Sequence, residues 1–423
     1  MLKSVPPDTA APAPTAATTQ VPFFRPDIGT REIDEVVAVL RSGWLTTGPK
    51  VRQFEREFAT AVNAPHTVAV NSCTAALHLA IEALGLRAGQ RVLVPTMTFA
   101  ATAEVLHYIG AVPVLVDCDP VTFNLDLDQA EKALERDADA RRGAAAPSDD
   151  TRIVGIMPVH VGGLMIDCDR LRALADQYGV WIVEDAAHAF PAAWRKNSDA
   201  PWQRCGDQTG TVTAFSFYAN KTITTGEGGM AATADAGLAD RMRLMSLHGL
   251  TNDAWDRYRG GKSWDYRIVA PGYKYNLTDV AAAIGIHQLS RAEEMRQNRE
   301  AVALAYLDAL SDVTEIELPP TDPNRIHSWH LFPVRLRLDT LSLDRDRIID
   351  ELRDLGIGCS VHWRPLHCHP YYQERFGLTP ESFPTASAQF ERVISIPIFS
   401  SMTEDEVGRV IESIRQLTRT FRR

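Results

Sequence analysis

The sequence predicts an α/β protein with a large domain, built on a mainly parallel sheet covered on both faces, and a smaller α+β domain after it. Two observations support this prediction. Short, fully apolar segments alternate with amphipathic helical segments, which is typical of a parallel sheet buried on both sides. After a long helical segment over residues 277–310 this rhythm changes, and shorter elements follow. A length of 423 residues suits about two to three domains.

The predicted elements of the large domain follow in a regular order. Apolar residues at helical spacing predict helices, and the first of these ends at a glycine. The helices are expected over residues 30–43, 74–86, 98–110, 124–136 and 167–179. Short apolar runs predict strands over residues 67–70, 91–95, 112–117, 151–159 and 180–185. Residues 135–152 are polar and rich in alanine, so we expect an exposed connection there.

The smaller domain is expected to follow a long helical region that is broken once. That region covers residues 277–310, and a strand (328–338), a helix (344–358), a strand (359–363) and a closing helix (403–421) come after it. We place the two domains at residues 21–290 and 291–423. Residues 1–20 are rich in Pro, Ala and Thr, and we expect a disordered tail.

Composition and charge exclude several classes of function. A net charge of −10 and a pI near 5.7 disfavour nucleic acid as a partner, because phosphate backbones need a basic face. No apolar run is long enough to span a bilayer, and the N-terminus has no apolar secretory core. Six scattered cysteines without C-x-x-C spacing indicate reduced thiols and no metal site. We expect a soluble, cytoplasmic protein that binds neither membrane nor nucleic acid.

Unusual residues stand at the ends of the predicted strands, where open parallel sheets bind their ligands. After the first strand, Ser72, Cys73 and Thr74 open a helix whose free N–H groups suit a phosphate. Plain N-capping by Ser72 or Thr74 is the alternative. Phe99 follows the next strand, where an aromatic ring either stacks on a planar cofactor or belongs to the core.

Two further strand ends carry ionisable groups. Asp185 ends an apolar strand, and a carboxylate at that depth needs a cationic partner. His188 follows on the same side; the alternative is an N-cap aspartate beside a surface histidine. Ser216 and Lys221 lie in the stretch FSFYANKTITTGEGGM, residues 215–230. Lys221 is therefore either a solvated lysine at a loop edge or a buried nucleophile.

Lys221 and Asp185 together fit one cofactor, pyridoxal 5′-phosphate (PLP). PLP needs a lysine for its Schiff base and a carboxylate that keeps its ring nitrogen protonated. The small polar residues at 72–74 supply a phosphate cradle. The sequence thus predicts a PLP site shared among several strand ends.

The chain also resembles a known family, the DegT/DnrJ/EryC1/StrS sugar aminotransferases of PLP fold type I, which are aspartate aminotransferase-like. Motifs in order carry the resemblance from about residue 22 to the C-terminus, among them NSCTAALHLA, VPTMTFAATAEV, VEDAAHAF, FSFYANKTITTGEGG and GYKYNLTDVAAAIG. The stretch PGYKYNLTD and the insert before it, residues 251–270, look closest to the branch that makes 4-amino-4-deoxy-L-arabinose on a UDP carrier.

The resemblance implies a role for each matching residue. Lys221 matches the Schiff-base lysine, and Asp185 matches the carboxylate facing the pyridine nitrogen. The other cofactor contacts are His188 beside the ring, Phe99 stacked on it, and a phosphate cup of Ser216, Thr74 and the backbone of Cys73. Asn276 matches an asparagine that reaches the phosphate from a partner subunit, which implies a homodimer with shared active sites. Many relatives have glycine at position 73; we expect the Cys73 side chain to point away from the cofactor.

The resemblance further implies amino transfer from an amino acid, with glutamate expected, to a keto-sugar nucleotide, with C4 expected. A 3-aminotransferase, a cyclitol aminotransferase, a dehydratase and a non-catalytic regulatory homologue are the alternatives. Some relatives that have histidine in place of the lysine are dehydratases, so Lys221 favours transamination. In the small domain we expect substrate contacts from His327, Trp329, His362 and Arg364, the alternative being core histidines and a surface arginine.

Overall fold

A computed structural model of the chain describes residues 20–142, 151–251 and 266–423. The predicted tail, apart from Gln20, lies outside the described residues. So do residues 143–150 of the expected connection and residues 252–265 of the insert. No helix within the described ranges combines the length and the apolar character needed to cross a membrane.

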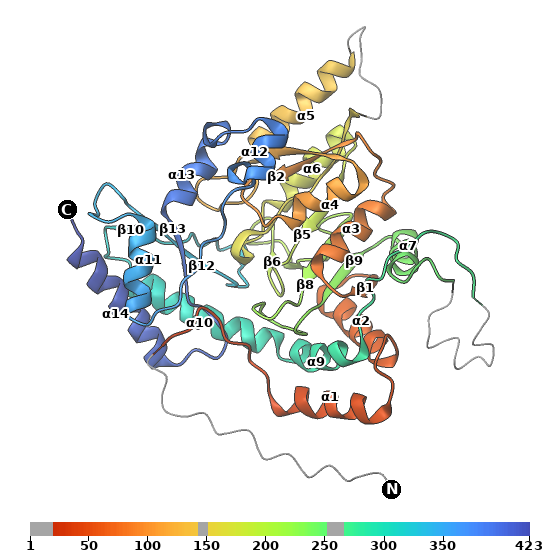
Figure 1. The fold of residues 1–423 in the computed structure, drawn as a ribbon, viewed down its shortest axis with the longest axis horizontal. Helices are drawn as coiled ribbons and strands as arrows, with labels where there is room; N and C mark the ends of the chain where they lie inside the picture. Colours follow the sequence, from red (N-terminus) through yellow and green to blue (C-terminus); the bar gives the residue numbers. More distant parts are fainter. Residues whose placement is uncertain (1–19, 143–150, 252–265) are drawn as a thin grey trace.

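A seven-stranded sheet in the order β1-β9-β8-β5-β4-β2-β3 forms the centre of the molecule (Figure 1). Its strands are β1 (His66–Val70), β2 (Arg91–Pro95), β3 (Val112–Val116), β4 (Ile153–Ile156), β5 (Trp181–Asp185), β8 (Val212–Ser216) and β9 (Gly229–Thr233). Only β9 runs antiparallel to its neighbours; the pairs among β8, β5, β4, β2 and β3 are parallel. The predicted mainly parallel sheet is confirmed.

Helices cover both faces of this sheet because alternate strand residues feed two separate apolar cores. Ile182 of β5 belongs to the core under α2, α5, α6 and α9, whereas the adjacent Val183 belongs to the core under α3, α4 and α7. These helices are α2 (Pro49–Val62), α3 (Cys73–Ala83), α4 (Ala101–Ile109), α5 (Leu127–Arg142), α6 (Cys168–Tyr178), α7 (Ala236–Ser246) and α9 (Asp279–Ser290). Helix α1 (Thr30–Ser42) packs outside, against α9.

The C-terminal part has its own sheet and core. Strands β10 (Ile316–Glu317), β12 (Phe332–Leu336) and β13 (Val393–Ile396) pack with helices α10 (Ala292–Ala309), α11 (Arg345–Asp354) and α14 (Glu404–Thr420). Helices α12 (Pro370–Phe376) and α13 (Pro384–Arg392) lie outside this core, and Tyr372 of α12 packs into the core under α3 and α4. A small sheet of β6 (Ala193–Trp194), β7 (Gln203–Arg204) and β11 (Arg325–Ile326) joins residues far apart in sequence.

The long helical region is broken once, as predicted, at Arg291 between α9 and α10. At the other end of the chain, Val21 belongs to the C-terminal core, and its N–H donates to the carbonyl of Gly356. The division into domains at residue 290 stays a prediction.

Two predicted elements differ from the structure. Residues 359–363 do not form a strand; only Ser360 makes a bridge, to Ser395 of β13. Helix α5 continues to Arg142 through part of the expected connection, because Asp137 is buried there and pairs with Arg91 and Arg141. The charged residues that made this stretch look exposed are thus engaged in ion pairs.

Candidate active site

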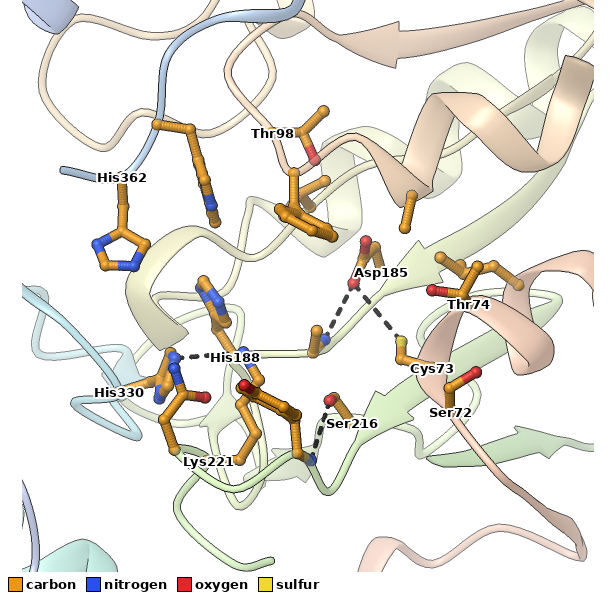
Figure 2. A pocket seen from close by; sticks show the side chains of 18 of the residues that line it. Ser72, Cys73, Thr74, Thr98, Asp185, His188, Ser216, Lys221, His330 and His362 are labelled. Atoms are coloured by element: carbon orange, nitrogen blue, oxygen red, sulfur yellow. Dashed lines mark hydrogen bonds between the residues drawn. The ribbon is translucent and has the colours of Figure 1, made fainter. Parts of the chain in front are cut away.

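A cavity of about 440 Å³ lies at the carboxyl edge of the central sheet (Figure 2). The ends of β5 and β8, the N-terminus of α3, the loop before α4 and the segment 361–363 all contribute to it. Its lining includes Ser72, Cys73, Thr74, Thr98, Phe99, Asp185, His188, Ser216, Tyr218, Asn220, Lys221, Glu227, His330, His362 and Trp363. The structure therefore brings seven of the eight predicted cofactor-binding residues into one pocket.

Lys221 enters the pocket from a turn rather than from a strand. Strand β8 ends at Ser216, and the Lys221 N–H donates to the carbonyl of Tyr218. The side chain is half-buried, and burial of its amine lowers the pKa to about 8 despite the opposing charge of Asp185. With this pKa, roughly a tenth of the amine is neutral and nucleophilic at pH 7 and about half at pH 8, far more than for an ordinary lysine.

Histidines surround this amine. The Nζ of Lys221 lies 3.3 Å from Nε2 of His330, and the His330 ring is 4.1 Å from that of His188 (Figure 2). Burial, followed by the charge of Lys221, holds the pKa of both imidazoles well below the usual range. Two neutral rings therefore flank Lys221, and Nε2 of His330 lies within hydrogen-bonding distance of its amine. The indole of Trp363 stacks on His188, with ring centroids 5.2 Å apart.

Asp185 is held at the end of β5 by donors on both of its oxygens. The hydroxyl of Thr102 donates to Oδ2 at 2.7 Å, and the N–H of Ala187 donates to Oδ1 at 3.1 Å. The side chain faces the pocket although the residue is only 5% exposed. Such a carboxylate is oriented before any ligand arrives.

The first turn of α3 fits a phosphate group. Ser72 caps the helix by accepting a hydrogen bond from the Ala75 N–H. The N–H groups of Cys73 and Thr74 lie in the first turn, where the helix itself provides no carbonyl to accept their hydrogen bonds. Strand β9 comes very close: a Cβ on Gly229 would lie 2.4 Å from the carbonyl carbon of Ser72. Gly229, the last glycine of the cluster after Lys221, is therefore needed for this close packing beside the cradle.

One expectation about this cradle is wrong. Cys73 has ordinary helical backbone, but its side chain does not point away from the pocket. Its Sγ lies 3.9 Å from Oδ1 of Asp185 (Figure 2), and burial raises the thiol pKa well above its usual range. Cys73 is thus a protonated thiol directed at the carboxylate.

Not all predicted residues reach the pocket. Phe99 does, with 62% of its side chain exposed for stacking, and so does His362. His327 and Trp329 are buried elsewhere and stack on each other, with centroids 4.0 Å apart. The Arg364 guanidinium lies over the ring of Phe390. The structure does not place these three in the pocket.

Asn276 also lies outside the pocket of its own chain. Its amide donates to the Thr47 hydroxyl at 2.7 Å, and it lines a separate surface hollow with Arg243 and Glu55. The role of Asn276 in a shared active site, which the resemblance implies, stays a prediction.

Sequence reasoning missed His330, Trp363, Tyr218, Asn220 and Glu227. His330 stands in the stretch SWHLF, residues 328–332. In this stretch the predicted substrate contact is the neighbouring residue, Trp329. The backbone of Trp329 has a φ of 49°, so the chain turns sharply there. The regular alternation of side chains along a strand therefore does not predict which of these side chains faces the pocket.

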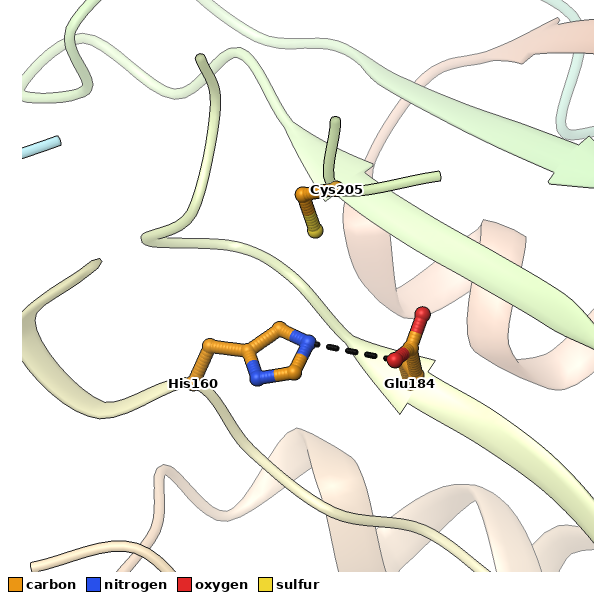
Figure 3. Close-up of side chains that lie close together, drawn as sticks. All are labelled: His160, Glu184 and Cys205. Atoms are coloured by element: carbon orange, nitrogen blue, oxygen red, sulfur yellow. Dashed lines mark ion pairs between the residues drawn. The ribbon is translucent and has the colours of Figure 1, made fainter. Parts of the chain in front are cut away.

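His160, Glu184 and Cys205 form a buried trio next to β5, the strand that carries both Glu184 and Asp185 (Figure 3). Nε2 of His160 lies 3.4 Å from Oε1 of Glu184, while its Nδ1 accepts from the Ile166 N–H. Since Nδ1 is an acceptor, Nε2 carries the proton and has no lone pair for a metal ion. Burial raises the pKa of the Cys205 thiol well above its usual range, so it stays protonated. The protonation of His160 and Cys205 thus argues against a metal ion at this trio.

Comparison with known proteins shows the family of the chain that forms this pocket. Residues 26–415 match the DegT/DnrJ/EryC1/StrS aminotransferase family. The chain belongs to this family. It is 41% identical over 400 residues to the spore coat polysaccharide biosynthesis protein SpsC of Bacillus subtilis, covering 94% of this chain and 97% of SpsC.

Solved structures of sugar aminotransferases have the same fold. Spr1654 from Streptococcus pneumoniae, solved in PLP and PMP forms, is 32% identical with TM-scores of 0.83 and 0.84, covering 95% of this chain and 99% of that one. The sugar aminotransferase CalS13 from Micromonospora echinospora is 30% identical with a TM-score of 0.78, covering 93% and 99%. The DegT/DnrJ/EryC1/StrS protein is thus a PLP-dependent sugar aminotransferase of fold type I.

The geometry of this pocket fits PLP well. The easily deprotonated amine of Lys221, the oriented carboxylate of Asp185 and the helix start at Cys73 offer the three groups that PLP needs, within one cavity.

The lowered pKa of Lys221 predicts how the cofactor-free protein takes up PLP. Only the neutral amine attacks the aldehyde, so the rate of uptake should rise with pH and level off above about 8. Stopped-flow absorbance over a pH series measures this rate. A rate that continues to rise towards about 10.4, as for an ordinary lysine, would contradict the assignment.

Proposed function

We propose that this sugar aminotransferase moves the amino group of L-glutamate to C4 of a keto-sugar nucleotide. The observation that carries the proposal is the pocket itself: Lys221 and Asp185 lie at its base, and exposed aromatic rings of Phe99 and Tyr218 lie at its mouth. A cavity of about 440 Å³ lies in the range of small-molecule sites. The kinship with SpsC, named for polysaccharide biosynthesis, supports a sugar destined for a surface glycan.

In this mechanism Lys221 is both the anchor of the cofactor and the proton carrier. When bound, PLP supplies a protonated ring that accepts the electron pair of the broken Cα–H bond. Lys221, released by the incoming amino acid, takes the Cα proton and returns it to C4′. The neutral His330 accepts one N–H of the amine and so directs its lone pair. Asp185 would accept the hydrogen bond of the protonated ring nitrogen.

Two further parts of the proposal concern assembly and location. A homodimer would let Asn276, which lies away from its own pocket, contribute to the partner's phosphate site. All six cysteines are free thiols, which supports a reducing cytoplasmic compartment. The resemblance of PGYKYNLTD supports a UDP carrier and the 4-amino-4-deoxy-L-arabinose branch.

The two half-reactions test this proposal in order. L-glutamate should bleach the visible band of the PLP protein, and a 4-keto-sugar nucleotide should restore it, because each step converts one cofactor form to the other. NMR of the product should place the new amine at C4. If only 3-keto sugars restore the visible band, the enzyme is a 3-aminotransferase. If only cyclitol ketones restore it, the enzyme is a cyclitol aminotransferase. Loss of a sugar hydroxyl without nitrogen transfer would indicate a dehydratase.

A further inference from the structure

The carboxylate of Asp185 is the end of a chain of buried hydroxyl groups. Thr102, on α4, donates to Oδ2 of Asp185 at 2.7 Å, and the Thr98 hydroxyl lies 2.8 Å from that of Thr102. Both threonines are at most 1% exposed. Thr98 itself lines the pocket (Figure 2).

The direction of this chain follows from the chemistry of its groups. An ionised carboxylate only accepts hydrogen bonds, so the single O–H of Thr102 donates to Asp185. The oxygen of Thr102 is then left as an acceptor, and Thr98 must donate to it. With the Ala187 N–H on Oδ1 and the Cys73 thiol 3.9 Å away, several donors point at Asp185.

Donors on a carboxylate stabilise its anionic form. Where a carboxylate shares a proton with a ring nitrogen, each such donor shifts that proton towards the nitrogen. We infer that Thr102, backed by Thr98, is a positioning residue whose hydroxyl keeps the shared proton on the cofactor nitrogen and holds Asp185 in line with it. This inference rests on the proposed contact between Asp185 and that nitrogen.

The test is a Thr102→Val variant, which keeps the shape of the side chain and removes the donor. We expect the ¹⁵N resonance of a ring-labelled PLP to move towards the unprotonated form in this variant. The single-turnover rate with glutamate should fall about ten- to hundredfold, because a hydrogen bond to a charged group is lost, while its dependence on glutamate concentration stays unchanged. Thr102→Ser retains the hydroxyl and should restore both.

A matched control is Thr213→Val. Thr213 is equally buried and donates at 2.6 Å to Glu184, the residue before Asp185, so its loss should affect stability but not the ¹⁵N resonance. If Thr102→Val does not fold, Thr98→Val should show a smaller shift in the same direction. A protonated wild-type ring with no shift in the valine variant overturns the inference. An unprotonated wild-type ring instead overturns the role of Asp185.

Discussion

Replacing Lys221 by alanine is expected to abolish amino transfer, with a loss of at least about 10⁴-fold in kcat. The variant loses both the covalent anchor of PLP and the group that moves the proton between Cα and C4′. The visible band of the lysine-bound cofactor should disappear as well. Absorbance spectra and a coupled assay for 2-oxoglutarate measure the two effects.

The fold of this variant should survive, because a lysine whose pKa is lowered by burial does not stabilise the protein in its charged form. The melting temperature of this variant should therefore be at least as high as that of the wild type. Lys196→Ala is the matched control, since the Lys196 side chain is 72% exposed. Turnover by Lys221→Ala at the wild-type rate would refute the assignment of the lysine.

Replacing Asp185 by asparagine is expected to lower kcat about 10²–10³-fold, the size of effect seen when one preorganised electrostatic partner is lost. The amide has the same shape but carries no charge opposite the ring nitrogen. It also sets an NH₂ group against either the Ala187 N–H or the Thr102 hydroxyl, both of which are donors. The visible band should persist, because Lys221 is intact, so this variant separates cofactor attachment from turnover.

Asp117→Asn is the control for a buried carboxylate at the end of another strand, β3 at the edge of the same sheet. Asp117 is 2% exposed and accepts from the N–H groups of Thr385 and Ala386, away from the pocket. Its substitution should lower stability and leave kcat per folded molecule unchanged. Full activity of Asp185→Asn would remove the carboxylate from the mechanism.

Much of the fold was predictable because its strands are fully apolar and its helices amphipathic. Strand β9 was not predicted, since Gly229–Thr233 contains glycine and alanine in place of β-branched residues and forms a strand only between β1 and β8. Helix α2 was also missed, although Val51, Phe54, Phe58 and Val62 are buried at helical spacing after a proline at its start.

The pocket was predictable where its residues stand directly after strands. Asp185 and Ser216 end β5 and β8, and the carboxyl ends of these parallel strands meet at one edge of the sheet. His330 and Thr102 were not predictable in this way. His330 enters after a sharp turn at Trp329, and Thr102 lies inside a helix where its hydroxyl looks like any other core threonine. Side-chain direction in such places depends on tertiary packing.

Reduction with borohydride tests the central claim most directly, namely that Lys221 holds the cofactor in this pocket. The reagent reduces the C=N bond between a lysine and PLP to a stable C–N bond, and mass spectrometry of the digested protein then locates it. We predict the phosphopyridoxyl group on the peptide that contains Lys221 and on no other lysine. A modification at a different lysine of the PLP-loaded protein, or none at all, would contradict the account.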